Sequence, residues 1–265
     1  MTVGGYAPPP GPYGQFQMPQ FMAEAPQSSN ASPSCPPGLE YLHQIDQLII
    51  KQKKELVEVV FNFHMRNKYE IRNSLGQHLW TAKEQSDCCA RLCFRKYRPL
   101  TLSVKDPLEN NPLFLIRPFR LPMGLCCWCN LCLAEMEVQG HGGIVLGFVR
   151  QLWHPFLPRF TVQTQDGQDA LFIHGPFCVC SCGSDVKFKV LDVSGNSIGL
   201  ICKRWGGCCK EWITAADNFT VQFPMDLDVK LKASLLAAAL LLVRKCLLEA
   251  KFPLSGEGKV VEGWC

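Results

Sequence analysis

The sequence predicts a mainly β protein, an antiparallel barrel or sandwich, that ends in one apolar helix. Three observations lead to this prediction. Short apolar or alternating runs recur along the middle of the chain, as expected for many short strands. Turn signals such as Asp166-Gly167 separate several of these runs. After Asp228 the pattern changes to a Leu- and Ala-rich stretch that contains neither Gly nor Pro.

The predicted strands share β-branched, aromatic or alternating apolar residues at roughly even spacing. They are Leu56–Phe61, Lys68–Arg72, Gln77–Thr81, Leu100–Val104, Ala134–Val138, Ile144–Val149, Phe160–Gln163, Ala170–Ile173, Val186–Val190 and Phe219–Phe223. Further turns are predicted at 73–76 and 194–196. No repeat of fixed period is evident.

The predicted helix covers about residues 229–249. Its uninterrupted apolar part, Ala233 to Val243, is about 16 Å long at about 1.5 Å per residue, and a bilayer has a hydrocarbon thickness of about 30 Å. Arg244 and Lys245 then interrupt it. The run is therefore short and charged for a comfortable membrane span but suitable for filling a barrel, and the sequence leaves open which of the two it does.

The chain divides into three predicted parts. Residues 1–38 are rich in Pro, Gly, Gln and Ser and are predicted to be a disordered tail, which could alternatively be a ligand for SH3- or WW-type modules. Residues 39–250 are predicted to form the folded domain, and residues 251–265 a short tail.

Composition narrows the class of protein. The net charge of +4 is too small to indicate nucleic acid as the main partner and suits an anionic membrane surface equally well. The N-terminus lacks the features of a secretory signal, so the 16 cysteines are expected to be reduced thiols inside the cell. Thr2 stands where N-myristoylation requires Gly. The sequence contains no nucleophile elbow, P-loop or dinucleotide fingerprint, and no enzyme is predicted.

A thiol cluster at 126–132 is the first candidate site. Cys126, Cys127, Cys129 and Cys132 lie among apolar and aromatic residues, a context that suits S-palmitoylation, and two or more acyl chains give stable anchoring. Two alternatives remain open: buried inert thiols, or a zinc site. The zinc site would take its second ligand group from Cys178, Cys180 and Cys182.

An acidic segment before the helix is the second candidate site. Asp217, Asp226 and Asp228 offer hard oxygen ligands of the kind that calcium prefers. The segment does not meet the EF-hand pattern. A solvated strand edge followed by a helix cap explains it as well, with Asp228 as the N-cap and Asp226 complementing the helix dipole.

A short basic patch is the third candidate site. Lys203 and Arg204, followed by Trp205, could contact phosphates or an import receptor. Two adjacent basic residues are a weak signal, and an exposed strand end is the preferred interpretation.

Several motifs, in one order and over about residues 35 to 249, resemble the phospholipid scramblase family. The matching stretches are Cys35–Leu42, Asn67–Ile71, Trp153–Pro158, Ala216–Phe219 and Gln222–Lys230. The resemblance implies a tubby-like fold, a closed antiparallel β-barrel around a central C-terminal hydrophobic helix. It also implies a palmitoylated cysteine cluster, a calcium segment before the helix, and ATP-independent, bidirectional movement of phospholipids between leaflets.

The sequence departs from the family pattern at three places. Ala215 stands where the calcium segment begins with an acidic residue, and Thr220 stands where it has Gly, so calcium binding is expected to be weak or lost. The cysteine cluster is thinner at Trp128 and Leu131. The charges that follow Val243 fall where the family's helix is mostly apolar.

The resulting prediction is a palmitoylated, scramblase-like membrane protein without covalent catalysis. Its partner is a phospholipid membrane, chiefly the cytoplasmic face of the plasma membrane, with a nuclear pool when it is unacylated. The alternative is a palmitoylated adaptor, signalling or nuclear regulatory protein of the same fold that moves no lipid. Self-association is left open.

Overall fold

The computed structural model describes residues 35–53, 67–86, 98–119, 132–177, 184–204 and 218–250, with side chains of the last segment as far as Val243. The strands are β1 (Gln47–Lys53), β2 (Lys68–Asn73), β3 (His78–Gln85), β4 (Leu100–Lys105), β5 (Leu113–Arg117), β6 (Glu135–Gly140), β7 (Val145–Leu152), β8 (Arg159–Thr164), β9 (Asp169–His174), β10 (Val186–Leu191), β11 (Ser197–Arg204) and β12 (Asn218–Gln222). The described helices are η1 (Glu40–Gln44), η3 (His141–Gly143) and α4 (Val229–Ala250).

The strands form one closed antiparallel barrel in which each strand pairs with its neighbours in the sequence. The ring closes where β1 pairs with β12, with Ile50 opposite Phe219. Because successive side chains of a strand point to opposite faces, alternate residues of each strand face the interior. In β1, for example, Leu48, Ile50 and Gln52 are buried. The prediction of a closed barrel is thereby confirmed.

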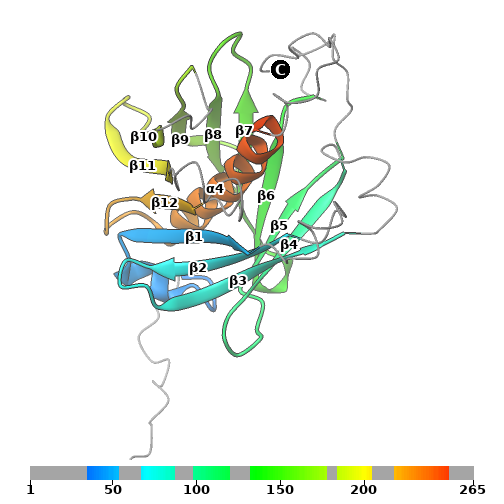
Figure 1. Cartoon of the computed structure of the whole chain (residues 1–265). Helices are drawn as coiled ribbons and strands as arrows, with labels where there is room; N and C mark the ends of the chain where they lie inside the picture. The colour runs from blue at the N-terminus through cyan, green and yellow to red at the C-terminus, as the bar shows by residue number, and fades with distance from the viewer. Residues whose placement is uncertain are drawn as a thin grey trace, which may run out of the picture. The chain divides into compact units, whose positions relative to one another are not determined.

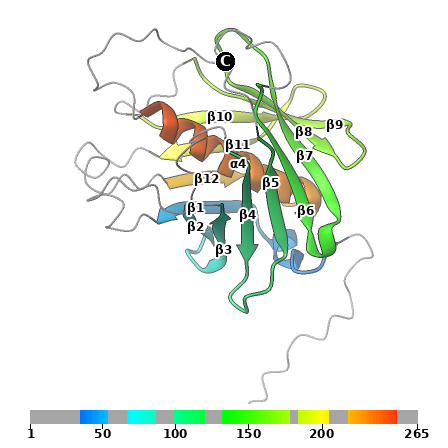
Figure 2. The same ribbon diagram turned by 90° about the vertical axis from the view of Figure 1, so that its right-hand side faces the viewer.

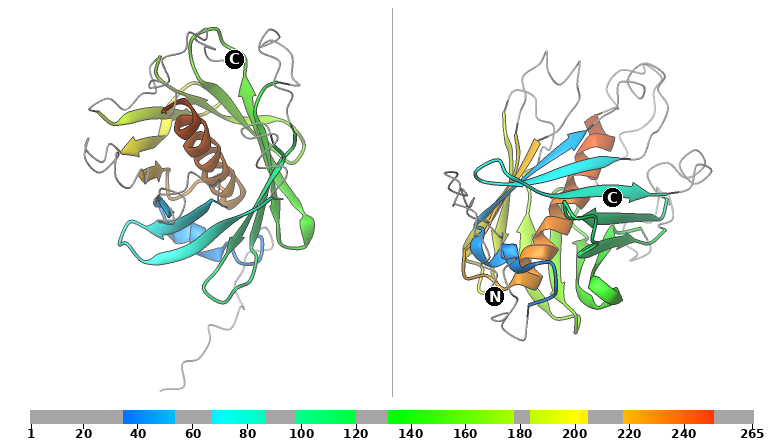
Figure 3. Two further views of the ribbon diagram at one scale, coloured as in Figure 1. Left: turned by 45° about the vertical axis from the view of Figure 1, so that its right-hand side comes forward. Right: turned by 90° about the horizontal axis from the view of Figure 1, so that it is seen from below.

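Helix α4 lies inside the ring of strands (Figure 1; Figure 2). The left view of Figure 3 shows the helix enclosed by the barrel. Every residue from Lys232 to Val243 is buried, and the helix packs against β6, β7, β8 and β12. Alanine is frequent on α4, and Gly147 of β7 lies where an added Cβ would be 3.1 Å from the Ser234 Oγ. Small residues thus allow the helix and the barrel wall to approach closely.

The antiparallel order gives the barrel two different ends. Short turns follow β2, β4, β6, β8 and β10 at one end, which we call the turn end; α4 also begins there. Strands β1, β3, β5, β7, β9 and β11 finish at the other end, which we call the loop end. All five connections that contain residues outside the described set run between strands at the loop end.

The turn end is built from the predicted turns. Gly76, Gly167 and Gly195 adopt φ values of 81°, 77° and 85°, a region that glycine enters without steric cost. Each of these glycines donates its N–H to the carbonyl oxygen three residues earlier, at distances of 3.0–3.1 Å. The turn predictions are therefore confirmed.

The interior of the barrel is more polar at the loop end. Glu84, at the end of β3, is fully buried and accepts a hydrogen bond of 3.0 Å from Nε of Arg98. Arg117 and Lys203 are also buried at the ends of β5 and β11. Charged groups therefore face inward at this end, whereas the middle of the barrel is apolar.

Three strands, β1, β5 and β11, are absent from the strands predicted from sequence; of β11 the sequence predicts only a strand end at Lys203 and Arg204. The apolar centre of β1 is only Leu48-Ile49-Ile50 before a Lys-Gln-Lys run, and β5 is a short apolar run between two prolines. The strand predicted over Leu56–Phe61 lies outside the described residues, as does most of the tail predicted over residues 1–38.

The enclosed helix yields a stability prediction. Leu236→Ala should lower the free energy of unfolding by about 2–5 kcal/mol, because Leu236 is fully buried and its truncation leaves a cavity. Leu75→Ala is the matched control, since Leu75 is 81% exposed on a turn and should change stability by less than about 0.5 kcal/mol. Urea unfolding measures both variants. If Leu236→Ala and Leu75→Ala lowered the free energy of unfolding equally, the enclosed position of the helix would be contradicted.

Candidate functional site

The structure describes one residue of the predicted acylation cluster. Cys132 is half-buried and lies at the loop end, three residues before β6 begins. Backbone hydrogen bonding joins Ala134 to Gln151, since the Gln151 N–H donates to the Ala134 carbonyl at 2.7 Å. Cys126, Cys127 and Cys129 lie outside the described residues.

The alternative zinc site also falls largely outside the described part of the chain. Cys178, Cys180 and Cys182 are not among the described residues, nor are Cys127 and Cys129. Among the residues that are described, no three His, Cys, Asp or Glu side chains group closely enough to hold a metal ion.

Strand β12 divides the acidic segment in two. Asn218, the neighbour of Asp217, begins β12 at the loop end, whereas Asp226 and Asp228 follow the strand at the turn end. Five residues of strand span about 16 Å. Asp217 itself lies outside the described residues, so the predicted calcium site stays a prediction.

Asp228 serves as the cap of α4, as the sequence predicts. Its Oδ1 accepts a hydrogen bond of 2.7 Å from the Lys230 N–H, and its carbonyl oxygen accepts one of 2.9 Å from the Lys232 N–H. Such a cap satisfies one of the backbone donors that the first turn leaves without a partner.

Lys232 is a buried cation at the entrance of the barrel, and the sequence analysis did not single it out. Its side chain is fully buried, and its Nζ donates to the carbonyl oxygens of Leu42 at 2.8 Å, Ile45 at 3.0 Å and Met225 at 2.7 Å. The Nζ also lies 5.2 Å from the centre of the Phe223 ring, within cation–π range. One ammonium thus joins α4 to η1 and to the segment after β12.

Burial lowers the pKa of Lys232, because desolvation disfavours the charged form. The carboxylates of Asp226 and Asp46 act in the opposite direction. The two carboxylates therefore help to keep Lys232 charged where α4 enters the barrel. The signal available in the sequence was a lysine placed one turn after the cap, directly before the apolar run that begins at Ala233.

The two residues of the predicted basic patch lie on opposite faces of β11. Arg204 is exposed and pairs with Asp185 at 3.0 Å, whereas Lys203 is 3% exposed and faces inward. The expectation of an exposed strand end is right for Arg204 and wrong for Lys203. The reason is the alternation of the strand, which sends adjacent side chains to opposite faces.

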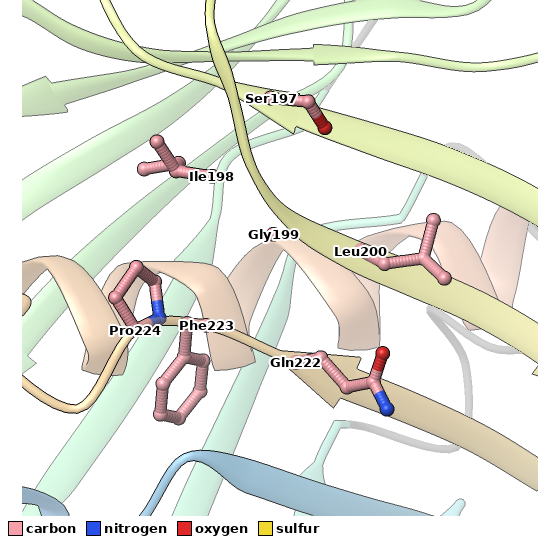
Figure 4. Close-up of a pocket in the computed structure, with 7 residues that line it drawn as sticks. All are labelled: Ser197, Ile198, Gly199, Leu200, Gln222, Phe223 and Pro224. Carbon is pink, nitrogen blue, oxygen red and sulfur yellow. The ribbon is translucent and has the colours of Figure 1, made fainter.

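An open pocket of about 430 Å³ lies between the start of β11 and the end of β12. Figure 4 shows its lining residues: Ser197, Ile198, Gly199, Leu200, Gln222, Phe223 and Pro224. Ser197 and Gln222 contribute the only polar side chains of this lining. The pocket therefore offers neither a general base nor a charged group, and it lies at the turn end, away from Cys132.

None of the helices in the described parts of the chain combines the length and apolarity that a membrane-spanning segment needs.

The contacts of Lys232 yield a second prediction. Lys232→Met should lower the free energy of unfolding by about 1–3 kcal/mol, because three carbonyl oxygens lose the hydrogen bond that they accept from the ammonium. Lys230→Met, two residues away and partly exposed, is the control and should have little effect. Thermal and urea unfolding measure both variants. If Lys232→Met were as stable as Lys230→Met, the stabilising role of Lys232 would be contradicted.

Comparison with known proteins gives a consistent result. The Scramblase family model matches residues 25–244. Phospholipid scramblase 1 of Mus musculus is 49% identical over 210 residues, which are 79% of this chain and 63% of the relative. Phospholipid scramblase 2 of Bos taurus is 47% identical over 210 residues, covering 79% and 71%. Phospholipid scramblase family member 5 of Homo sapiens is 40% identical over 223 residues, covering 84% and 81%.

The match therefore spans less than two thirds of the length of the mouse relative. No solved structure matches the chain. The family model covers most of the chain and includes all twelve strands of the described barrel. The chain belongs to the phospholipid scramblase family.

Proposed function

We propose that this protein moves phospholipids between the two leaflets of a membrane, in both directions and without ATP. The observation that carries the proposal is the 47–49% identity over 210 residues to proteins named phospholipid scramblases, together with the family model that matches residues 25–244.

Membrane attachment in this proposal uses palmitate on Cys126, Cys127, Cys129 and Cys132. Acylation at several cysteines gives stable binding, whereas one chain gives only marginal binding. Cys132, the member of this cluster that the structure describes, lies at the loop end and is half-buried. The attached protein would reside on the cytoplasmic face of the plasma membrane, and the unacylated protein would supply a nuclear pool.

Calcium enters the proposal only as a weak effector. Asp226 and Asp228 lie at the turn end, and Asp228 already caps α4. Binding there would compete with this cap, because the Asp228 carboxylate accepts a hydrogen bond in the first turn. We therefore propose that calcium changes the rate of lipid movement little.

A second candidate function is that of a palmitoylated adaptor or nuclear regulator that moves no lipid. One observation favours it: the apolar side chains of α4 from Ala233 to Val243 are covered by the barrel. Such a protein would act through the outer surface of the barrel and through the Pro-rich residues 1–38, which could bind SH3- or WW-type modules.

Reconstitution tests the proposed activity. Liposomes with a fluorescent phospholipid in one leaflet should lose their asymmetry faster when they contain the purified full-length chain than when they contain no protein. The rate should not depend on ATP, and adding calcium or a chelator should change it by less than about twofold. Asymmetry that persists as in protein-free liposomes would favour the adaptor.

Acylation is tested separately in cells. Replacing Cys126, Cys127, Cys129 and Cys132 with Ala should move most of the protein from the membrane fraction to the soluble or nuclear fraction, since fewer acyl chains bind less tightly. Cys35→Ala is the control, because Cys35 lies partly buried near the start of α4. Thioester-specific labelling should follow the same pattern. Unchanged membrane residence of the quadruple variant would refute acyl anchoring.

A further inference from the structure

Exposed aromatic side chains gather at the loop end of the barrel. Trp153 and Phe156, in the connection between β7 and β8, are 47% and 60% exposed. Phe177, after β9, is 68% exposed, and its ring centre lies 6.2 Å from that of Phe156. We call Trp153, Phe156 and Phe177 the aromatic patch. Large aromatic groups that contact each other while facing solvent indicate a surface that meets an apolar partner.

The backbone holds the connection between β7 and β8 in a fixed shape. Nδ1 of His154 accepts hydrogen bonds from the N–H groups of Phe156 at 3.1 Å and Leu157 at 2.9 Å. Pro155 and Pro158 further restrict the backbone. The exposure of Phe156 is therefore built into the turn.

A basic row lies directly beside the aromatic patch. Arg159 of β8 pairs with His174 of β9, and His174 pairs with Lys189 of β10. All three side chains are on the outer face, because their neighbours Phe160, Ile173 and Val190 face inward. Burial, followed by the charges of Arg159 and His154, lowers the pKa of His174, so Arg159 and Lys189 carry the lasting charge.

The patch is continuous with the predicted acylation site. The β6–β7 ladder pairs Met136 with Val149 and Glu135 with Arg150, and the bond between Ala134 and Gln151 continues it. Two further steps along the same register bring Cys132 to the level of Trp153. On the other side of β6, Phe119 follows β5 and is 41% exposed.

We infer that the aromatic patch and its basic row form the face by which this protein docks onto an anionic lipid bilayer. Trp and Phe favour the interface between headgroups and acyl chains, and Arg and Lys attract anionic headgroups. The inference rests on the proposed attachment to membranes. It adds which end of the barrel faces the bilayer and which side chains enter it.

The turn end has a different chemistry. Its exposed apolar residues, such as Leu75 and Leu108, lie on separate turns. Carboxylates accompany them, among them Asp106 beside Leu108 and Asp192 in the turn after β10. Negative charge at the turn end would be repelled by an anionic bilayer, so the loop end is the end that fits it.

Binding of unacylated, full-length protein to vesicles tests the inference without contributions from palmitate. The vesicles contain phosphatidylcholine with or without phosphatidylserine, and co-sedimentation measures binding. The variant with Trp153→Ala, Phe156→Ala and Phe177→Ala should bind about tenfold more weakly than the wild type, because binding scales with buried apolar area. The control variant with Leu75→Ala and Leu108→Ala should bind like the wild type. Equal losses in both variants, or no loss in either, would overturn the inference.

Charge and depth provide two further readouts. The variant with Arg159→Gln and Lys189→Gln should lose most of the preference for vesicles that contain phosphatidylserine, and salt should weaken wild-type binding. Lipids brominated in the upper acyl chain should quench tryptophan fluorescence less in Trp153→Phe than in the wild type. Circular dichroism confirms that each variant folds. Identical quenching in a folded Trp153→Phe variant would place Trp153 outside the bilayer and overturn the inference.

Lipid redistribution, measured on the same vesicles, separates this inference from the proposed function. Patch-dependent binding without redistribution would refute scrambling and leave the docking face in place. Redistribution with binding that does not depend on the patch would refute the docking face alone.

Discussion

The rest of the structure depends on the enclosure of α4 by the barrel. An isolated apolar helix of this composition would expose Leu235, Leu236 and Leu240 to water, and a twelve-stranded ring without a helix would enclose an empty space. Each removes the apolar surface of the other from solvent, and close packing at Gly147 and the helix alanines makes the contact continuous. The ends of the barrel are where this mutual burial finishes and where polar groups begin.

Lys232 shows how the enclosure is completed at the turn end. Where the helix enters the barrel, the carbonyl oxygens of Leu42, Ile45 and Met225 are directed toward the ammonium, and an apolar residue at position 232 would remove the hydrogen bond that each of them accepts from it. A single ammonium satisfies all three. The same geometry explains why the acidic segment is occupied with structural roles: Asp228 caps the helix, and the charge of Asp226 favours the protonated form of Lys232.

Much of the fold could be predicted from the sequence because the barrel wall alternates between buried and exposed residues. Strands such as β10 have one apolar face, and the turns carry glycine at positive φ. Alternation alone does not distinguish a barrel from a sandwich, since both have one buried face per strand; the family resemblance made that distinction. Local patterns also fail where the decisive partner is distant. Lys232 meets Leu42, which lies 190 residues earlier.

The aromatic patch, too, could be predicted from the sequence only in part. The Trp153–Pro158 motif was visible as a family match, but its exposure depends on its place beyond the end of β7, and its nearness to Cys132 depends on the register between β6 and β7. Antiparallel order places short, carboxylate-bearing turns at one end and the aromatic and basic residues at the other. A barrel with two such unlike ends has a built-in direction. Lipid contact at the loop end leaves the entrance of α4 and its buried ammonium on the side away from the bilayer, where membrane binding does not disturb the contacts that hold the helix in place.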